Sequence, residues 1–317
     1  MRTVFLDYET VSNGDLDATA LIAAAGEIDF FPDTPDSAVA ARIAAADIVL
    51  ANKAMLSAER LAGARNLRLI ALAATGTNNV DLAAAEERGI AVCNVRAYCT
   101  SSVVQHAWSM ILSLTQHLPE YGRLATDGSW VAEEASAMLA HPIRELAGLR
   151  LGIVGWGTLG RGVAKVGEAF GLGTLVCSRP GIPPEPGRLP LDELLAKADI
   201  VSLHCPLTPT TRGLIGAREL ALMKPSALLI NTARGALIDT HALADALRSR
   251  RLGGAGIDVL PQEPPVDGDP LLDAAIPNLI VTPHVAWAAR EARQRCLDEV
   301  AANVRDFLAG GRRGRVV

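Results

Sequence analysis

Aromatic side chains are scarce in this sequence, and other features that would define a function class are missing as well. Phenylalanine, tyrosine and tryptophan make up only 4% of the residues, although 50% are hydrophobic. The core must therefore consist largely of alanine, valine, leucine and isoleucine, which is typical of an α/β protein. No apolar stretch reaches the roughly 18 residues of a membrane span. Asp7 and Glu9 interrupt the N-terminus before a signal-like segment forms, so we expect no signal peptide.

The sequence also lacks an excess of positive charge and a paired set of cysteines. Its formal net charge is −5, which argues against a nucleic-acid or anionic-membrane partner. The five cysteines form no CxxC pair, and an odd number cannot close completely into disulfides. We therefore expect a cytoplasmic protein without a metal site, which binds neither nucleic acid nor membranes.

Segments rich in β-branched residues alternate with segments of helical periodicity, and this pattern occurs twice. At 317 residues the chain exceeds the roughly 250 residues of a single core. The fold class that we expect is α/β, with two doubly wound parallel-sheet domains. The first strands are predicted at residues 3–6, 48–50, 67–72 and 90–93. The pattern restarts at Leu151 and continues with strands at residues 174–177, 200–203, 227–231, 256–259 and 279–281.

Three further segments define the domain boundaries. Residues 101–118 are apolar enough for a largely buried helix, and residues 119–144 predict a looser stretch. Residues 287–308 have helical composition without proline, and we expect them to return the chain to the first domain. The predicted division is a substrate domain of residues 1–99 plus 286–317 and a dinucleotide-binding domain of residues 100–285.

A glycine-rich turn follows the strand-like segment at Leu151. Gly155, Gly157 and Gly160 match G-x-G-x-x-G, with a plausible helix directly after them. The first two glycines permit a tight turn and a close approach to pyrophosphate, and the third permits tight helix packing. Glycine turns are common, but the strand before and the helix after this one favour dinucleotide binding.

The residues about 20 positions further on bear on the choice of cofactor. NAD-binding units usually have an acid there, which accepts the ribose hydroxyls. This chain has Ser178 and Arg179 instead, and Glu185 follows only beyond two prolines. A missing acid beside an arginine suits a 2′-phosphate, so NADP is favoured over NAD, with a solvated Arg179 as the alternative.

Three residues with complementary chemistry each follow a predicted strand of the second half. Arg234 is suited to holding a substrate carboxylate, His284 to exchanging a proton, and Glu263 to stabilising the imidazolium. Taken singly, each has an ordinary structural alternative: a surface ion pair, a loop charge or a core histidine. Together, at the carboxyl ends of parallel strands, they indicate a catalytic site.

The order of the motifs resembles that of the D-isomer-specific 2-hydroxyacid dehydrogenases. GWGTLG, HCPLTPTTRGLIG, MKPSALLINTARGALID, GIDVLPQEPP and TPHVAWAA carry this resemblance through most of residues 150–290. ANKAML, LAATGTNNVDLAAAEERGIAVCNV, HPIRELAG and HVAWAAREARQR extend it, and they look closest to the glycerate dehydrogenases, also called hydroxypyruvate reductases.

The resemblance implies roles for further residues. Arg234 would anchor the carboxylate, His284 would be the acid/base with Glu263 as its partner, and Asp258 would face the nicotinamide. The other implied cofactor-binding residues are Thr158, Leu159, Cys205, Pro206, Thr211, Thr232 and Ala233. The implied substrate-binding residues, besides Arg234 and His284, are Lys53, Thr75, Gly76 and Trp287.

The function that we expect is NAD(P)H-dependent reduction of a small 2-keto acid, hydroxypyruvate or glyoxylate, by a homodimer. A 3-phosphoglycerate dehydrogenase would use the same three catalytic residues, but we would expect a separate regulatory domain and extra cations for the phosphate. A nucleotide-sensing co-repressor of the same fold, the other alternative, would be suggested by long disordered tails.

Overall fold

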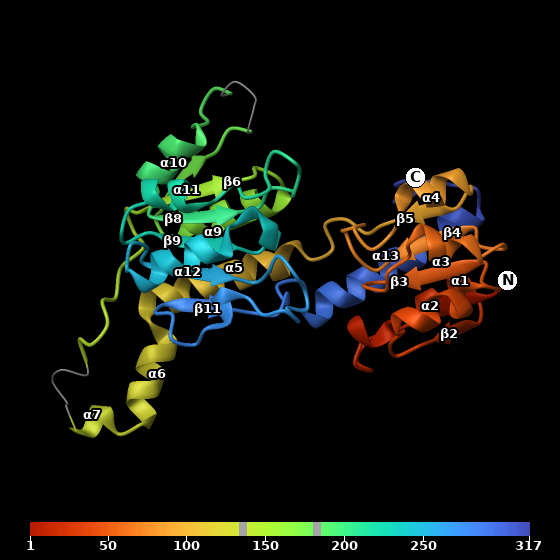
Figure 1. Cartoon of the computed structure of the whole chain (residues 1–317), viewed down its shortest axis with the longest axis horizontal. Helices are drawn as coiled ribbons and strands as arrows, with labels where there is room; N and C mark the ends of the chain where they lie inside the picture. The colour runs from red at the N-terminus through yellow and green to blue at the C-terminus, as the bar shows by residue number, and fades with distance from the viewer. Residues whose placement is uncertain (133–137, 180–184) are drawn as a thin grey trace. The chain divides into compact units, whose positions relative to one another are not determined.

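The computed structural model in Figure 1 describes residues 1–132, 138–179 and 185–317. The chain divides into two compact units. Unit 1 comprises Met1–Cys99 and Trp287–Val317, and unit 2 comprises Thr100–Ala286. Each unit contains its own parallel sheet with helices on both faces. The predicted fold class is therefore confirmed.

Unit 1 is built on a five-stranded parallel sheet with the order β2-β1-β3-β4-β5. Its strands are β1 (Thr3–Phe5), β2 (Ile28–Phe30), β3 (Ile48–Ala51), β4 (Leu69–Leu72) and β5 (Ala91–Cys93). This is the flavodoxin-like order, in which the chain reverses its direction of progress between β1 and β3. Ligands of such sheets bind beyond the carboxyl ends of the strands at that reversal. The loops after β1 and β3 are therefore the expected ligand-binding loops of unit 1.

Helices from distant parts of the chain cover the two faces of this sheet. One face packs against α1 (Thr19–Ala25) and α13 (Arg290–Leu308). The other face packs against α2 (Asp36–Ile43), α3 (Ala58–Ala62) and α4 (Leu82–Glu87). A short 3-10 helix, η1 (Tyr8–Thr10), follows β1. Helix α13 therefore completes one face of the first sheet, although it follows unit 2 in the sequence.

Unit 2 has a six-stranded parallel sheet with the order β11-β10-β9-β8-β6-β7. Its strands are β6 (Arg150–Val154), β7 (Gly173–Val176), β8 (Ile200–Leu203), β9 (Leu228–Asn231), β10 (Gly254–Ile257) and β11 (Leu279–Val281). The chain moves from β6 to the edge strand β7 and then crosses to β8 on the other side of β6. The reversal point therefore lies between β6 and β8.

The faces of the second sheet are covered by two groups of helices. On one face lie α5 (Thr100–Gln116) and α9 (Thr158–Ala169), joined by a hydrogen bond from Trp108 Nε1 to the Val163 carbonyl. On the other lie α10 (Leu191–Lys197), α11 (Ala217–Leu222) and α12 (Thr240–Arg248). Two short 3-10 helices, η2 (Gly235–Leu237) and η3 (Pro270–Leu272), lie in loops at this sheet.

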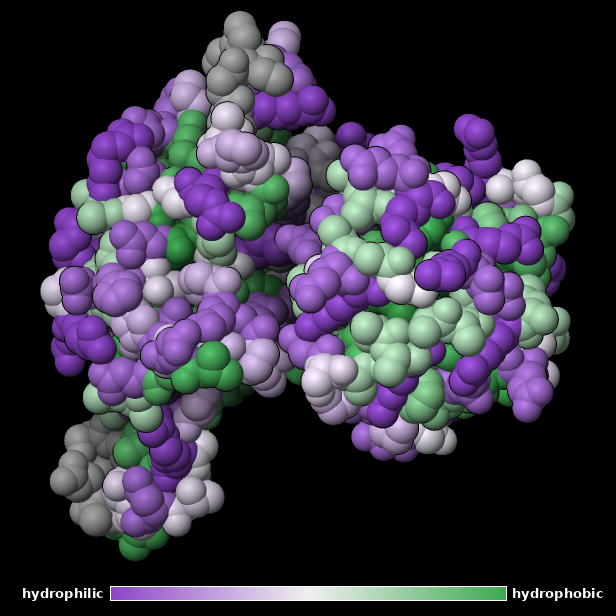
Figure 2. Space-filling model, turned by 45° about the vertical axis from the view of Figure 1, so that its right-hand side comes forward, coloured by the Kyte–Doolittle hydropathy of each residue, from purple (hydrophilic) through white to green (hydrophobic). Residues whose placement is uncertain are grey.

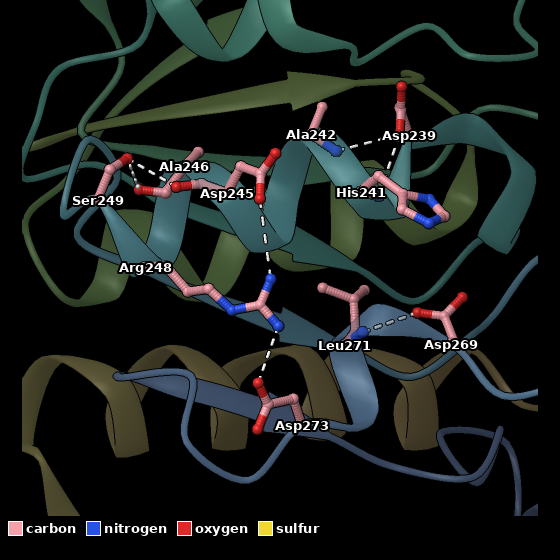
Figure 3. A network of polar contacts seen from close by, with 10 residues as sticks. All are labelled: Asp239, His241, Ala242, Asp245, Ala246, Arg248, Ser249, Asp269, Leu271 and Asp273. Atoms are coloured by element: carbon pink, nitrogen blue, oxygen red, sulfur yellow. Dashed lines mark hydrogen bonds and ion pairs between the residues drawn. The ribbon is translucent and has the colours of Figure 1, made fainter.

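Helix α12 is fixed at both ends by polar contacts that Figure 3 shows. Asp239 caps its N-terminus by accepting hydrogen bonds from the amides of His241 and Ala242. Arg248, in the last turn, pairs with Asp273 at 2.8 Å, in the loop that leads to β11. The Arg248–Asp273 pair is partly exposed and individually weak, but it links the end of α12 to the loop before β11.

The structure differs from the sequence-based predictions in three local details. Residues 119–144 were expected to be loose, yet α6 (Leu118–Thr126) and α7 (Ser129–Ala132) lie there, and residues 133–137 fall outside the described part. Strand β2 was not predicted at all, because it has three residues, none of them fully buried. The strand expected at residues 256–259 is Gly254–Ile257, so Asp258 begins a loop instead of lying within the strand. In the described ranges, no helix is long and apolar enough to cross a membrane.

Candidate active site

The glycine-rich turn lies at the reversal point of the second sheet. Gly155 follows β6 with a φ of 108°, a left-handed conformation that favours glycine. A Cβ at Gly155 would lie 2.5 Å from the amide nitrogen of Cys205, in the loop after β8. A Cβ at Gly160 would lie 2.1 Å from the Gly155 carbonyl oxygen. These two glycines therefore allow the turn, the neighbouring loop and helix α9 to pack together.

The other residues of the turn face outward. Gly157 and Thr158 are exposed, and a Cβ at Gly157 would meet nothing within 4 Å. Helix α9 begins at Thr158, so its first amides are available at this edge of the sheet. Leu159 is half-buried beside them. The surface therefore has the free amide donors and the open backbone that a pyrophosphate requires.

The loop after β8 packs against the glycine-rich turn at Gly155. Thr211 is buried, and its hydroxyl donates to the Pro206 carbonyl at 2.8 Å and accepts from the Thr208 amide at 2.7 Å. The predicted residue Thr211 thus shapes the loop through contacts within the chain. Cys205 is half-buried and Pro206 is exposed.

A half-buried histidine precedes that loop. His204 Nε2 lies 2.9 Å from Ser202 Oγ, whereas its Nδ1 is buried without a partner among the described residues. Burial disfavours the charged ring and lowers the pKa of His204 to about 4. Thr232 Oγ1, after the next strand, is also buried and unpartnered in the described part of the chain. The loops that follow β8 and β9 thus begin with hydrogen-bonding atoms that the described residues leave unsatisfied.

Arg234 is presented by a tight turn after β9. The buried side chain of Asn231 bridges this turn, accepting from the Ala233 amide at 3.0 Å and donating to the Arg234 carbonyl at 2.9 Å. Arg234 Nη1 also donates to the Ala233 carbonyl at 2.7 Å. Among the described residues no carboxylate pairs with Arg234, so its planar fork is available for an external carboxylate.

Glu263 lies on a loop that packs directly against this turn. A Cβ at Gly235 would lie only 2.0 Å from the carbonyl carbon of Leu260, so only glycine lets the two loops approach this closely. Glu263 Oε1 accepts from the Leu260 amide at 2.9 Å, and Oε2 lies 2.5 Å from His284 Nδ1. The structure therefore brings the predicted Glu263 and His284 together, on the loops after β10 and β11.

His284 contacts Glu263 through its ring nitrogen Nδ1. Because Nδ1 faces the Glu263 carboxylate, Nδ1 carries a proton, and Nε2 is the atom that can exchange one. The two side chains retain 28% and 33% of their exposure, so the pair is accessible from outside. The Glu263 carboxylate orients the imidazole ring, which makes the pair suited to proton exchange with a substrate.

Asp258 is fully occupied by contacts within unit 2. Its carboxylate accepts from the amides of Val285 and Ala286, both at 2.9 Å, and from the Thr282 hydroxyl at 2.5 Å. Its side chain is buried. The structure thus has Asp258 supporting the loop that carries His284, whereas its predicted contact with the nicotinamide stays a prediction.

The two residues on which the NADP prediction depends have different environments. Ser178 Oγ donates to the Leu189 carbonyl at 2.7 Å, so the hydroxyl is engaged with the backbone. Arg179 is exposed. Neither side chain blocks the end of β7, where the ribose of a bound dinucleotide lies in this fold.

In unit 1, Lys53 follows β3, next to the reversal point of the first sheet. Asp7, buried at the end of β1, accepts hydrogen bonds from the amides of Asn52, Lys53 and Ala54 at 2.9, 2.5 and 2.7 Å. One carboxylate thereby fixes the backbone of the whole loop, while the Lys53 side chain is exposed. The loop suits an ion-pairing role for Lys53.

The remaining predicted substrate residues also belong to unit 1. Thr75 Oγ1 donates to the Val95 carbonyl at 2.7 Å, and Asn94 Nδ2 donates to the Thr75 carbonyl at the same distance. Gly76 follows Thr75 in the loop after β4. The Trp287 ring packs edge-on against Tyr98, with centroids 6.5 Å apart. These residues lie in loops after the strands or, for Trp287, before α13.

A glycine turn at the reversal point, an arginine fork and a histidine–carboxylate pair are the features of a dinucleotide-dependent dehydrogenase. A model of the D-isomer-specific 2-hydroxyacid dehydrogenase NAD-binding domain matches residues 108–286. The chain belongs to the D-isomer-specific 2-hydroxyacid dehydrogenase family and is an enzyme of this type, as the sequence predicted.

Relatives and solved structures agree with this assignment. The chain is 44% identical to a glycerate dehydrogenase of Methylorubrum extorquens over 277 residues, which cover 87% of each chain. It is 36% identical to a hydroxypyruvate reductase of Blautia hydrogenotrophica, with 98% of each chain covered. A crystal structure of a protein from Thermus thermophilus superimposes with a TM-score of 0.87 at 35% identity, over all of both chains.

Several residues of the site were missed by the sequence analysis. Asp7 and Asn231 hold the loops of Lys53 and Arg234, and Thr282 contacts the Asp258 carboxylate. The available signal was a polar residue at the end of an apolar strand, because such a residue lies at the edge where ligands bind. The described residues contain no cluster of three or more His, Cys, Asp or Glu that could hold a metal.

Proposed function

We propose that this enzyme reduces hydroxypyruvate or glyoxylate to D-glycerate or glycolate, and catalyses the reverse reaction. The observation that carries the proposal is the 2.5 Å contact between Glu263 Oε2 and His284 Nδ1. The loop that holds Glu263 also packs against the turn that holds Arg234. The names of the relatives, glycerate dehydrogenase and hydroxypyruvate reductase, support this substrate class.

The roles of the three side chains follow from their contacts. Arg234 forms a bidentate pair with the substrate carboxylate, because its fork has no carboxylate partner in the described chain. This fixes the keto carbon relative to the histidine. His284 donates its Nε2 proton to the carbonyl oxygen as negative charge develops there, and Glu263 stabilises the imidazolium before transfer.

The residues of unit 2 fit a nicotinamide dinucleotide. Gly155 has no space for a side chain, the first turn of α9 offers amides, and two buried polar atoms, Thr232 Oγ1 and His204 Nδ1, lack partners in the described chain. The backbone around Thr158, Cys205 and Ala233 would hold the cofactor. When bound, a reduced nicotinamide supplies the hydride for the keto carbon.

NADPH is the proposed reductant, because Arg179 is exposed beside Ser178 where an acid would otherwise repel the 2′-phosphate. A guanidinium–phosphate contact contributes roughly 1.5 to 3 kcal/mol, or about tenfold to over a hundredfold in binding. Fluorescence titration of the free enzyme should give a lower Kd for NADPH than for NADH. Ser178→Asp with Arg179→Ala should reverse the preference. Tighter NADH binding by the wild type would refute this cofactor assignment.

Steady-state kcat/KM values test the substrate proposal. Hydroxypyruvate, glyoxylate, pyruvate and 3-phosphohydroxypyruvate should each be assayed with both reduced cofactors. The highest value is expected for hydroxypyruvate or glyoxylate. A clear preference for the phosphorylated acid would instead favour a 3-phosphoglycerate dehydrogenase. Absence of turnover with all four would favour a nucleotide-sensing protein.

We also propose a homodimer formed through unit 2. Its α6–α7 arm and the following segment expose large apolar side chains, among them Val131 at 90%, Leu139 at 87% and Trp130 at 55%. Hydrophobic residues, coloured green, are visible on this arm in Figure 2. A cavity of about 950 Å³, lined partly by Leu228 and Ile276, lies at the amino ends of the strands. A second copy would cover both surfaces.

Light scattering tests the dimer. The wild type should have twice the mass of one chain, and Val131→Glu with Leu139→Glu should give monomers. A monomeric wild type would refute the proposal. A cytoplasmic location is proposed on the cysteine pattern, and all five cysteines are free thiols in the structure.

A further inference from the structure

Four neighbouring strands of unit 2 are each followed by a polar residue in one register row. Ile257 pairs with Val281 on one side and with Asn231 on the other, and Asn231 pairs with Leu203. The residues directly after these strands therefore also lie side by side, with their side chains on one face of the sheet. In strand order from β11 to β8 they are Thr282, Asp258, Thr232 and His204.

Helix α5 contacts the Thr282 end of this row through a second histidine. His106 Nε2 lies 3.0 Å from Thr282 Oγ1, and Thr282 Oγ1 lies 2.5 Å from Asp258 Oδ1. A hydroxyl has one proton, and the Thr282 hydroxyl donates it to the Asp258 carboxylate. His106 must then carry its proton on Nε2 and donate to the Thr282 oxygen. The direction of both hydrogen bonds is thereby fixed, from α5 toward the carboxylate.

This chain of contacts ends on the loop that presents His284. His284 has a φ of 54°, a left-handed conformation that is costly for a residue other than glycine. Its amide donates to the Asp258 carbonyl at 2.7 Å, and the two following amides donate to the Asp258 carboxylate. Such a conformation persists only where surrounding contacts determine it, so the orientation of the Asp258 carboxylate matters for the position of His284.

The same face of α5 holds the loop at a second point. Ser102 Oγ donates to the Ala286 carbonyl at 2.6 Å. Ser102 and His106 are four residues apart, so both side chains project from one face of the helix. Helix α5 thus contacts the loop at its beginning and at its end.

We propose that His106 and Thr282 are positioning residues of the reaction. They orient the Asp258 carboxylate, which holds the backbone on both sides of the proton donor His284. This inference rests on the proposed function, because it assumes that His284 exchanges the substrate proton. It extends that function by assigning a role to α5, a helix that carries none of the three proposed catalytic residues.

His106 could influence the Asp258 carboxylate through the Thr282 hydroxyl or by a direct contact, and we propose the first. His106 Nε2 is also 3.5 Å from Asp258 Oδ1, so a direct interaction is the competing arrangement. If His106 acts through the hydroxyl, its substitution has no further effect once the hydroxyl is absent. If it acts directly on the carboxylate, its substitution retains its effect in that background. A double-mutant cycle separates the two.

The variants for the test are Thr282→Val, His106→Leu, their combination, and the rescue variants Thr282→Ser and His106→Gln. Serine retains the hydroxyl, and the glutamine amide nitrogen reaches about as far as the imidazole Nε2. Ser109→Ala is the matched control, because Ser109 lies on the exposed side of α5 and donates only to its own helix. The readouts are the single-turnover rate of NADPH oxidation with saturating glyoxylate or hydroxypyruvate, the NADPH Kd and the Tm.

Thr282→Val should lower the single-turnover rate about tenfold, as expected for losing a hydrogen bond to a carboxylate, and His106→Leu about three- to tenfold. The NADPH Kd should change less than about twofold. The double variant should be no slower than Thr282→Val, and both rescue variants should recover most of the rate. A merely structural role would lower the Tm without this rescue of the rate.

Three results would overturn the inference. The first is a rate within about twofold of wild type for either single variant. The second is a rate that the rescue variants do not restore. The third is an effect of His106→Leu that is as large in the Thr282→Val background as in the wild type. Failure of the proposed function is read from a different variant. If His284→Asn retains the wild-type rate, His284 is not the proton donor and both proposals fail. If it abolishes the rate while His106→Leu and Thr282→Val do not lower it, only the positioning role is lost.

Discussion

Replacing His204 by glutamine should change how the stability of the free enzyme depends on pH. Burial lowers the pKa of His204 to about 4, compared with 6.5 for an ordinary histidine. Between these values the unfolded chain binds a proton that the folded chain excludes, so the free energy of unfolding rises with pH in this window. Each pKa unit between the folded and unfolded values corresponds to about 1.4 kcal/mol. The histidine therefore costs ~3 kcal/mol of stability when the pH falls from 7 to below 4.

The assay is urea unfolding of the cofactor-free enzyme at pH 7 and at pH 4.5. Three of the four tryptophans lie in unit 2, so their fluorescence reports mainly on the unit that contains His204. His204→Gln should lose ~2 to 3 kcal/mol less than wild type between the two pH values, because glutamine does not titrate. His241→Gln, which removes an exposed ring from α12, is the matched control. Equal losses in wild type and His204→Gln, within about 0.5 kcal/mol, would refute the reasoning.

Three further predictions concern the site. Arg234→Lys keeps the charge but removes the planar fork, so kcat/KM should fall at least about tenfold while the cofactor Kd stays constant; unchanged kcat/KM would remove Arg234 from the site. Glu263→Gln removes the carboxylate 2.5 Å from His284 Nδ1, so kcat/KM for keto-acid reduction should fall at least about tenfold, and an unchanged value would contradict the assigned role. Gly155→Ala would place a Cβ 2.5 Å from the Cys205 amide nitrogen, so the NADPH Kd measured by fluorescence should rise at least about tenfold. A wild-type Kd would show that the loop after β8 can move to accommodate the methyl group.

The sequence predicted most of the strands because a parallel sheet buries continuous apolar segments, such as Ile200–Leu203, whose predicted ends agree with the structure. Strand β2 was missed because Asp29 and partial exposure leave its three residues without such a pattern. Helices α6 and α7 were missed because Gly122 and Gly128 suggested an irregular stretch, whereas Gly128 lies between the two helices.

For the site, residues within a local sequence motif could be predicted, whereas residues whose role depends on a tertiary contact could not. Arg234, Glu263 and His284 could be identified because each lies in a recognisable motif after a strand, and the structure brings the last two into contact. His106 could not be identified from its helix, because its contact with Thr282 depends on how α5 crosses the sheet. The 2.0 Å that a Cβ at Gly235 would leave to Leu260 is likewise a property of two loops that meet only in the folded unit.

The division of unit 1 into two chain segments has a consequence for the order of folding. Unit 2 is continuous in sequence, so all of its strands and helices are available before α13 has been synthesised. Unit 1 buries one face of its sheet under α13, and Arg293 of this helix pairs with Asp15 across a separation of 278 residues. A chain emerging from the ribosome therefore exposes the part of this apolar face that α13 covers until that last helix has been synthesised. This long loop closure makes the completion of unit 1 the slow and aggregation-prone step of folding.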